Sequence, residues 1–293
     1  MTTRQQRIAT PPLRKALMTL LAALVALYLA VLAAGALFYR RLLYPAPAAF
    51  PAEVPSGARL LEAPTSDGAR VRALLYDAPP GAPLLVLFHG NGETMGHDTW
   101  IAAALRRRGL GVALVEYRGY GLSRGEPSPT EAGLYADAAG ALDALEAAGY
   151  RRERLVLWGQ SLGSGVAAEM ALRGRCGALV LVSPYTSIVD MARLITPTGI
   201  PVGLLVRDRY DTLAKAARIA VPALVIHGDA DELIPHAMGE RIAGALPRGA
   251  LHTVRGGHHG DVVAVGAAEL FEAVAKLAGG LVEPGSGGAV PAL

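Results

Sequence analysis

The 293-residue chain has one cysteine, Cys176. A single cysteine excludes an intramolecular disulfide bond and a cysteine-rich zinc site. Cys176 precedes an apolar run, so we expect a buried and unreactive thiol. The seven histidines show no spacing typical of a metal site, and the sequence therefore predicts no bound metal.

Acidic residues are absent from residues 1–41, which carry six of the 28 basic side chains. The other 252 residues hold the remaining 22 basic and all 25 acidic side chains, a net charge of −3. Domains that bind nucleic acid carry a basic patch of their own. Since none is visible here, we expect no nucleic-acid partner.

Charge of either sign is absent from Ala16 to Tyr39. These 24 residues exceed the roughly 20 that span a bilayer as a helix. They also exceed the apolar region of a signal peptide, which has about 7–15 residues. We predict an uncleaved transmembrane signal anchor at 16–39, after a basic flank at 1–15. A signal peptide cleaved near Ala34-Gly35-Ala36 and a buried core helix are the alternatives.

The flanks of this segment predict its orientation. Arg4, Arg7, Arg14 and Lys15 precede it, and the Arg40-Arg41 pair follows it. The more basic flank tends to remain in the cytoplasm. We therefore expect a single-pass protein of the cytoplasmic membrane with its main domain on the extracytoplasmic side, although Arg40-Arg41 opposes this orientation.

Proline and glycine mark the boundaries of that main domain. Four prolines between Pro45 and Gly57 indicate a semi-extended linker at 40–57. Glycines and prolines predict a flexible tail at 279–293. The residues between them, 58–278, contain no internal repeat and suit one domain.

Strand and helix patterns alternate through 58–278. Two strands come first and are expected to pair antiparallel. Six mainly apolar runs of the kind found in parallel sheets follow, with helical patterns between them. These runs are LLVLF (84–88), GVALVE (111–116), RLVLWG (154–159), ALVLVS (178–183), ALVIHG (223–228) and ALHTV (250–254). The pattern predicts a three-layer α/β/α sandwich with a mostly parallel sheet, whose ligands bind at the carboxyl ends of the strands.

A serine lies between two glycines where one predicted strand gives way to a helix. Gly159-Gln160-Ser161-Leu162-Gly163 matches the pattern of a nucleophile elbow, whose sharp turn exposes the serine hydroxyl. A serine needs a base to accept its proton, and that base needs an acid. We predict Ser161 as a nucleophile and look for both partners further along the chain.

Both partners follow later strands, in the order acid then histidine. Asp231 is the predicted acid, with Asp229 and Glu232 as alternatives. His258 is the predicted base, because glycines precede it and free the loop to turn it inward; His259 is the alternative.

An acyl-transfer site also needs N–H donors for the oxyanion. We expect the backbone N–H groups of Asn91 and Leu162 to supply them, and His89 to brace the loop that carries Asn91.

Taken together, HGNGE, EYRGYGLSRGEPS, GQSLGSG, HGDADELIP and GGHHGD resemble the α/β-hydrolase superfamily. More narrowly, the chain is similar to serine-aminopeptidase-like domains and to membrane-anchored lysophospholipase and depalmitoylase-type serine hydrolases. The resemblance covers about 58–278. It implies the α/β-hydrolase fold and an acyl-enzyme mechanism through Ser161, His258 and Asp231, with no cofactor.

Three positions depart from that family's pattern. Glu116 replaces the usual aspartate before Tyr-Arg-Gly, so Arg118 is expected to pair with it or to brace a loop. Ser164 replaces a glycine after the elbow. His259-Gly260-Asp261 stands where the relatives have Asn-Asp after the histidine, which leaves His258 and His259 in competition.

Residues 184–215 are expected to form a small cap over the site. The apolar run 200–206 within it has three possible roles: lining an acyl pocket, touching lipid, or packing in the core. With the anchor, it favours a lipid-like ester or thioester substrate. A peptidase or aminopeptidase of the same fold and a non-catalytic binding protein are the rival functions, and the sequence leaves the oligomeric state open.

Overall fold

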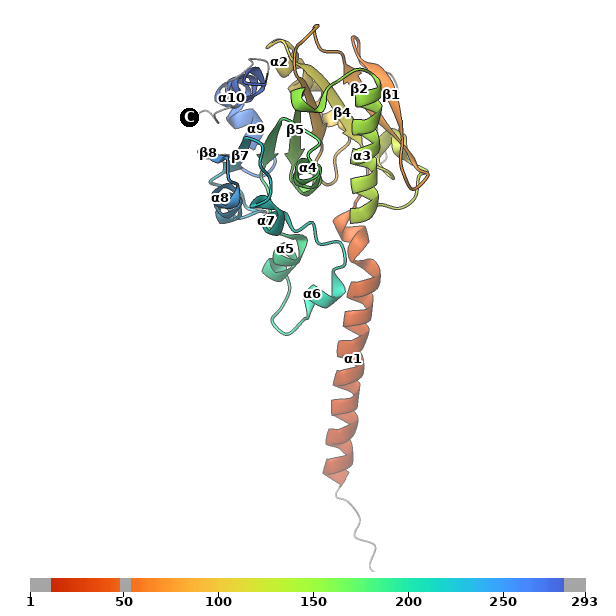
Figure 1. Ribbon diagram of the computed structural model, residues 1–293. Coiled ribbons are helices and arrows are strands. Elements are labelled where there is room, and N and C mark those ends of the chain that lie inside the picture. The colour runs from red at the N-terminus through yellow and green to blue at the C-terminus, as the bar shows by residue number, and fades with distance from the viewer. Residues whose placement is uncertain (1–11, 48–53, 282–293) are drawn as a thin grey trace, which may run out of the picture.

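The computed structural model describes residues 12–47 and 54–281. Residues 1–11 of the predicted basic flank, 48–53 of the predicted linker and 282–293 of the predicted tail lie outside the described residues. A long helix, α1 (Pro12–Leu43), projects from a domain built around one sheet (Figure 1).

The sheet has eight strands in the order β1-β2-β4-β3-β5-β6-β7-β8. The strands β1 and β2 pair antiparallel, β2 joins β4 antiparallel, and every later pairing is parallel. This confirms the lead-in pair and the mostly parallel sheet. The strands are β1 (Arg59–Pro64), β2 (Arg70–Tyr76), β3 (Leu84–Phe88), β4 (Gly111–Glu116), β5 (Leu155–Gln160), β6 (Ala178–Val182), β7 (Ala223–Gly228) and β8 (Gly249–Val254).

Helices cover both faces of the sheet, so the three-layer prediction is confirmed. Leu84, Val86 and Phe88 of β3 face a core shared with α3 and α4, whereas Leu85 and Leu87 face a core shared with α2 and α10. A strand buried on both sides has no polar face, which explains its wholly apolar sequence. The helices of the domain are α2 (Thr99–Arg106), α3 (Glu131–Ala147), α4 (Leu162–Leu172), α5 (Ile188–Ile195), α6 (Val202–Leu205), α7 (Thr212–Ala216), α8 (His236–Ala245), α9 (Val262–Val265) and α10 (Ala267–Gly279).

Helix α1 is long and apolar enough to cross a membrane: its most apolar 18-residue window, within Leu13–Leu43, has a mean hydropathy of 2.5. None of its most apolar window is buried against the rest of the protein, which excludes the buried core helix. The helix also continues to Leu43, into the predicted linker. Arg40 and Arg41 in its last turn favour this extension because cations stabilise a helix C-terminus, and Pro45 then prevents further helix.

Asp208 joins the end of α1 to the domain. Its buried carboxylate accepts hydrogen bonds from Tyr39 Oη at 2.9 Å and from Arg40 Nε at 2.7 Å. It also accepts one from the backbone N–H of Glu131, at the start of α3. A buried carboxylate must be paired and hydrogen-bonded, so these contacts fix the helix on the domain.

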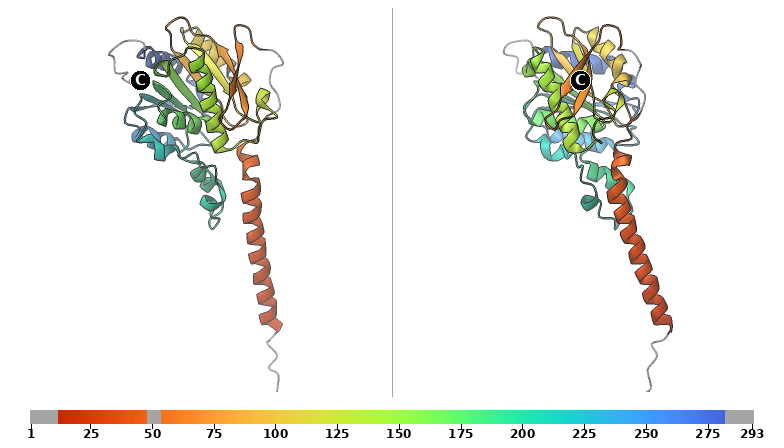
Figure 2. Two further views of the ribbon diagram at one scale, coloured as in Figure 1. Left: turned by 45° about the vertical axis from the view of Figure 1, so that its right-hand side comes forward. Right: turned by 90° about the vertical axis from the view of Figure 1, so that its right-hand side faces the viewer.

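The helices α5, α6 and α7 lie within the predicted cap. Val189, Val202 and Val206 form a small core of their own, so part of the apolar run 200–206 packs internally. Leu204 of the same run is 83% exposed. Figures 1 and 2 show α5 and α6 away from the sheet, on the side of the domain from which α1 projects, and α6 contacts α1.

Candidate active site

Ser161 lies on a tight turn between β5 and α4. Its φ of 47° and ψ of −116° are unusual for a residue with a side chain. Such backbone strain persists only where the surroundings enforce it. Here the Ser161 N–H donates to Val182 O at 2.9 Å, and Ser164 Oγ donates to Ser161 O at 2.6 Å. Ser164 thus fits where relatives carry a glycine.

Both glycines of the elbow are required by close packing. A Cβ at Gly159 would lie 2.3 Å from Gly163 O, and a Cβ at Gly163 would lie 2.0 Å from Phe88 O. Both oxygens belong to the backbone in the interior of the domain, so they cannot move aside. The Gly-x-Ser-x-Gly pattern therefore lets the turn and α4 pack directly on the ends of β3 and β5.

His259, not His258, lies between the serine and the acid. His259 Nε2 is 3.1 Å from Ser161 Oγ, and its Nδ1 is 2.9 Å from Asp231 Oδ2. His258 points into solvent with 57% of its side chain exposed, and its Nδ1 is 3.1 Å from Glu232 Oε2. The expectation that His258 would contact Ser161 is therefore wrong, and the alternative, His259, takes that place.

The glycines before His258 do not turn it inward, contrary to expectation. A Cβ at Gly228 would lie 2.0 Å from Gly257 O, so the loop after β8 lies directly on the end of β7. From there the chain turns into α9, whose first N–H, on Val262, donates to His258 O at 3.0 Å. That turn directs His258 outward and His259 inward. The run His259-Gly260-Asp261, which preserves the relatives' histidine-to-aspartate spacing, was the signal for His259.

Asp231 has no exposed side-chain surface and lies where the sequence predicted an acid. Its Oδ1 accepts hydrogen bonds from the N–H groups of Leu233 and Ile234 at 3.0 and 2.8 Å. Burial raises the pKa of Asp231, but hydrogen bonds from His227, His259 and Ile234 N–H outweigh burial and hold the pKa well below its ordinary value. The carboxylate is therefore ionised and suited to stabilise a protonated imidazole.

The two competing acids take other roles. Asp229 Oδ1 accepts a hydrogen bond from Gly256 N–H at 2.6 Å and so ties two strand-end loops together. Glu232 is exposed and faces His258. Neither is hydrogen-bonded to His259 Nδ1, whose partner is Asp231.

His227 is a further partner of Asp231, to which the sequence alone assigned no role. It is fully buried in β7, and its Nε2 is 2.9 Å from Ile234 O and 3.4 Å from Asp231 Oδ2. Since both neighbours are acceptors, Nε2 carries the proton. His227 thus fixes the loop that holds the acid, and its position four residues before Asp231 was the available signal.

The loop after β3 carries the predicted oxyanion donor Asn91. Tyr120 Oη donates to Asn91 Oδ1 at 3.3 Å, and Gly90 N–H donates to Glu93 Oε2 at 2.8 Å, so the loop is held on both sides. Leu162, the second predicted donor, is the first residue of α4. A first-turn N–H has no acceptor within its helix and can serve an oxyanion.

His89 braces this loop from beneath, as expected. Its Nδ1 is 2.8 Å from Gly90 O and its Nε2 is 3.1 Å from Glu116 Oε1, with both side chains fully buried. Burial lowers the pKa of His89, but the Glu116 carboxylate outweighs burial and raises it above the ordinary value. Glu116 therefore pairs with His89 and not with Arg118.

Arg118 instead binds two aspartates and braces a different loop. Its guanidinium lies 2.7 Å from Asp137 Oδ1 in α3 and 2.7 Å from Asp67 Oδ2 in the β1–β2 turn. Of the two roles considered for Arg118, the structure supports the loop brace.

Asp98 is a second buried acid near His89, in addition to Glu116, and we expect it to make stability depend on pH. Burial raises its pKa to about 8, with Glu93 adding to the effect. Between about pH 4 and pH 8 the unfolded state therefore ionises while the folded state stays protonated, and the free energy of unfolding falls as pH rises. Asp98→Asn should flatten this slope and stabilise the protein at pH 8 by a few kcal/mol. Urea titrations from pH 5 to 8 test this, with the exposed Asp143→Asn as control. An unchanged slope in Asp98→Asn would contradict it.

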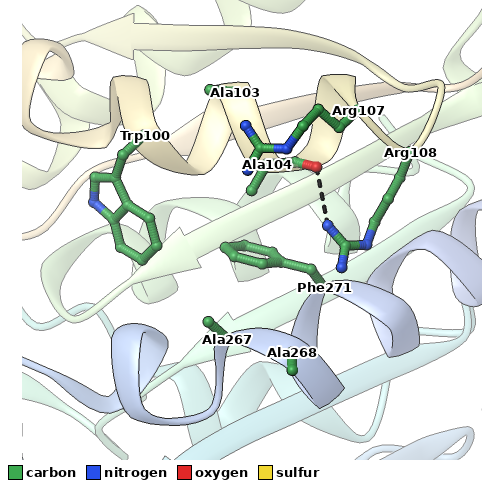
Figure 3. Close-up of a pocket in the computed structure, with 8 residues that line it drawn as sticks. All are labelled: Trp100, Ala103, Ala104, Arg107, Arg108, Ala267, Ala268 and Phe271. Carbon is green, nitrogen blue, oxygen red and sulfur yellow. Dashed lines mark hydrogen bonds between the residues drawn. The ribbon is translucent and has the colours of Figure 1, made fainter.

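A surface hollow lies elsewhere on the domain. It has a volume of about 380 Å³ and lies between α2 and α10, where Trp100 and Phe271 face each other below Arg107 and Arg108 (Figure 3). Its lining contains no serine, histidine or acid, so it offers no acyl-transfer chemistry. Within the described residues, no three His, Cys, Asp or Glu side chains are grouped as metal ligands.

Comparisons with known proteins agree with this architecture. The family model for serine aminopeptidases of family S33 matches residues 80–207. The uncharacterized protein Rv2307c of Mycobacterium tuberculosis is 34% identical over 230 residues, which cover 74% of this chain and 80% of that protein. Human α/β hydrolase domain-containing protein 17B is 33% identical over 178 residues, covering 60% of this chain and 59% of the human protein.

A solved structure shows the same fold at lower identity. The Pyrococcus furiosus esterase Pf2001 superposes with a TM-score of 0.65 at 18% identity, over 79% of this chain and 96% of the esterase. The elbow at Ser161 occupies the strand-to-helix turn that defines this fold. Sequence kinship, sheet order and elbow geometry together place the chain in the α/β-hydrolase superfamily, and more narrowly among the hydrolases related to the S33 serine aminopeptidases.

Proposed function

We propose that the protein is a membrane-anchored serine hydrolase that cleaves carboxylic ester or thioester bonds. The observation that carries this proposal is the continuous hydrogen-bonded series Asp231–His259–Ser161. A serine hydroxyl, an imidazole and a buried carboxylate in this order are the components of an acyl-transfer triad.

The geometry supports a two-step reaction. Ser161 Oγ attacks the carbonyl carbon as His259 Nε2 accepts its proton, and Asp231 stabilises the resulting imidazolium. The backbone N–H groups of Asn91 and Leu162 bind the oxyanion. His259 then returns the proton to the leaving group, and water, activated by the same imidazole, releases the acyl group from Ser161.

Labelling of the nucleophile tests the function directly. We expect a fluorophosphonate to modify the full-length protein in detergent at Ser161 alone, because this is the serine whose proton a histidine can accept. Mass spectrometry of the labelled peptide locates the adduct. Ser161→Ala should lose the label and Ser164→Ala should keep it. A folded wild-type protein that resists the reagent and hydrolyses no p-nitrophenyl ester from acetate to palmitate would favour the binding-protein alternative.

A peptidase is the second candidate, favoured by the family model. An aminopeptidase needs an acid to bind the free amino group of its substrate, and Glu93 is the acid beside Gly90 and the nucleophile. Both of its carboxylate oxygens are already engaged, by Gly90 N–H and by Gln160 Nε2. We therefore rank peptide substrates second; hydrolysis of aminoacyl-p-nitroanilides faster than esters would reverse the order.

The proposed anchor is α1, supported by its length, its hydropathy and its exposed apolar surface. The excess of basic residues before the helix supports an extracytoplasmic position for the domain. A hydrolase held at a bilayer meets acyl chains at high local concentration, which supports lipid-like substrates.

A further inference from the structure

A second apolar segment lies beside α1. Residues 194–206 of the cap contain no charged side chain and are bounded by Arg193 and Arg207. Three large aliphatic side chains on this segment face solvent: Leu194 is 55% exposed, Ile195 84% and Leu204 83%. Ile195 and Leu204 are more exposed than any other large apolar side chain among the described residues. Such a concentration marks a surface that meets an apolar partner.

The cap follows α1 over about half of the helix. Near the domain, Arg40 binds Asp208. Further along, Leu205 lies against Gly35, and at the tip of the cap Tyr28 Oη donates to Gly199 O at 2.8 Å. Twelve residues separate Tyr28 from Arg40, so the cap extends about 18 Å along the helix axis.

This extent conflicts with a cap that stays in water. The hydrocarbon core of a bilayer is about 30 Å thick and takes about 20 helical residues. Every stretch of that length within the uncharged Ala16–Tyr39 includes Tyr28. The end of such a stretch that is nearest the domain lies between Gly35 and Tyr39. This places the backbone of Tyr28 about 10–16 Å inside the hydrocarbon. Gly199, which is hydrogen-bonded to the Tyr28 hydroxyl, then also lies within the hydrocarbon.

Part of the backbone at the cap tip is satisfied as that environment requires. An unpaired backbone group in hydrocarbon costs several kcal/mol, so irregular backbone there must be satisfied internally. Pro197 and Pro201 have no N–H to satisfy, Tyr28 satisfies the carbonyl of Gly199, and the N–H of Ile200 donates to Pro197 O.

The charged residues at the base of the segment are suited to the membrane surface. Arg193, Arg207 and Arg209 are exposed and lie at the end of the segment nearest the domain. Arginine side chains at this level can bind lipid phosphates while their stems remain in the apolar layer.

We propose that residues 194–206 insert into the apolar part of the leaflet beside α1, as a second membrane-embedded element. This rests on the membrane anchoring proposed above and extends it to the cap. The cap begins next to the nucleophile, since Tyr185 Oη donates to Leu162 O at 3.2 Å. Lipid thus surrounds an element that is continuous with the wall of the site.

Spin labels on the full-length protein in phosphatidylcholine–phosphatidylglycerol liposomes test the insertion. The labels are attached to cysteines introduced by Ile195→Cys or Leu204→Cys, each in a protein that also carries Cys176→Ala. Leu24→Cys, on the exposed surface of α1, is the lipid reference, and Arg151→Cys, before β5, is the water reference. The measurement compares collision rates with oxygen, which partitions into lipid, and with a polar nickel chelate.

We expect the oxygen-to-nickel ratio at 195 and 204 to exceed the ratio at 151 several-fold and to approach the ratio at 24. If the oxygen-to-nickel ratios at positions 195 and 204 equal the ratio at position 151, while the label at position 24 lies in lipid, the proposed insertion is wrong and the proposed anchor stands. A label at 24 that is open to nickel would instead overturn the anchor. Labels at 195 and 204 shielded from both reagents would show that a second copy of the chain covers the cap, which also overturns the proposal.

Discussion

Replacing His259 with alanine is expected to lower kcat/KM for a p-nitrophenyl ester by about 10⁴-fold or more, whereas His258→Ala should change it less than about threefold. His259 Nε2 is the base within hydrogen-bond reach of Ser161 Oγ. His258 is exposed and faces Glu232. Two adjacent histidines thus differ in effect by three orders of magnitude or more. Ester hydrolysis by the two purified variants, side by side, measures the difference.

The matched pair controls for general effects of losing a histidine from this loop. Residues that act as one unit have non-additive effects, so Ser161→Ala combined with His259→Ala should be no slower than either single variant. Circular dichroism should show the same fold in all variants. A large loss in His258→Ala with little loss in His259→Ala would show that the loop rearranges when substrate binds and that our assignment of the base is wrong.

The second large effect is expected from one methyl group at the elbow. Gly163→Ala should reduce the free energy of unfolding by about 3 kcal/mol or more, because the added Cβ would lie 2.0 Å from Phe88 O. Relief of that contact must move α4 or β3, and both carry the site. Since a displacement of about 1 Å can cost 10²-fold in rate, ester hydrolysis should fall as well.

Urea unfolding in detergent measures the stability loss, and Gly244→Ala is the matched control. Gly244 lies in α8 with no atom within 4 Å of an added Cβ, so alanine there should be neutral or stabilise by up to about 1 kcal/mol. If Gly163→Ala is as stable and as active as Gly244→Ala, the close packing of the elbow on β3 is not what holds Ser161 in place.

The arrangement of strands could be predicted because it follows from local patterns. Apolar runs of five or six residues identify buried parallel strands, and alternation with helices fixes the three layers. The elbow was also predictable, since its two glycines and its serine lie within five residues of sequence. Chemistry at the carboxyl ends of the strands follows from the same rule.

The choice between His258 and His259 could not be made from the glycines alone. The direction of the two side chains depends on how the loop after β8 packs on the end of β7, where Gly257 O lies against Gly228. Similarly, Glu116 pairs with His89 and Arg118 with Asp137, although Glu116 and Arg118 are neighbours in sequence. Tertiary packing of segments far apart in the chain decides such pairings, and no local pattern reports it.

In the anchored hydrolase proposed above, the junction at Asp208 also affects which substrates the protein can reach. A domain joined to its anchor by a flexible linker could change its orientation and its distance from the bilayer, and could meet substrates at many heights. Here Tyr39 and Arg40 hold the domain on the last turn of α1, and Tyr44 Oη lies 2.9 Å from Tyr210 Oη just beyond it. In the anchored protein proposed above, Ser161 therefore stands at one height and one tilt over the lipid surface. A substrate would then be cleaved only if its scissile bond lies at the height of Ser161 above the membrane, so that height would contribute to substrate selection.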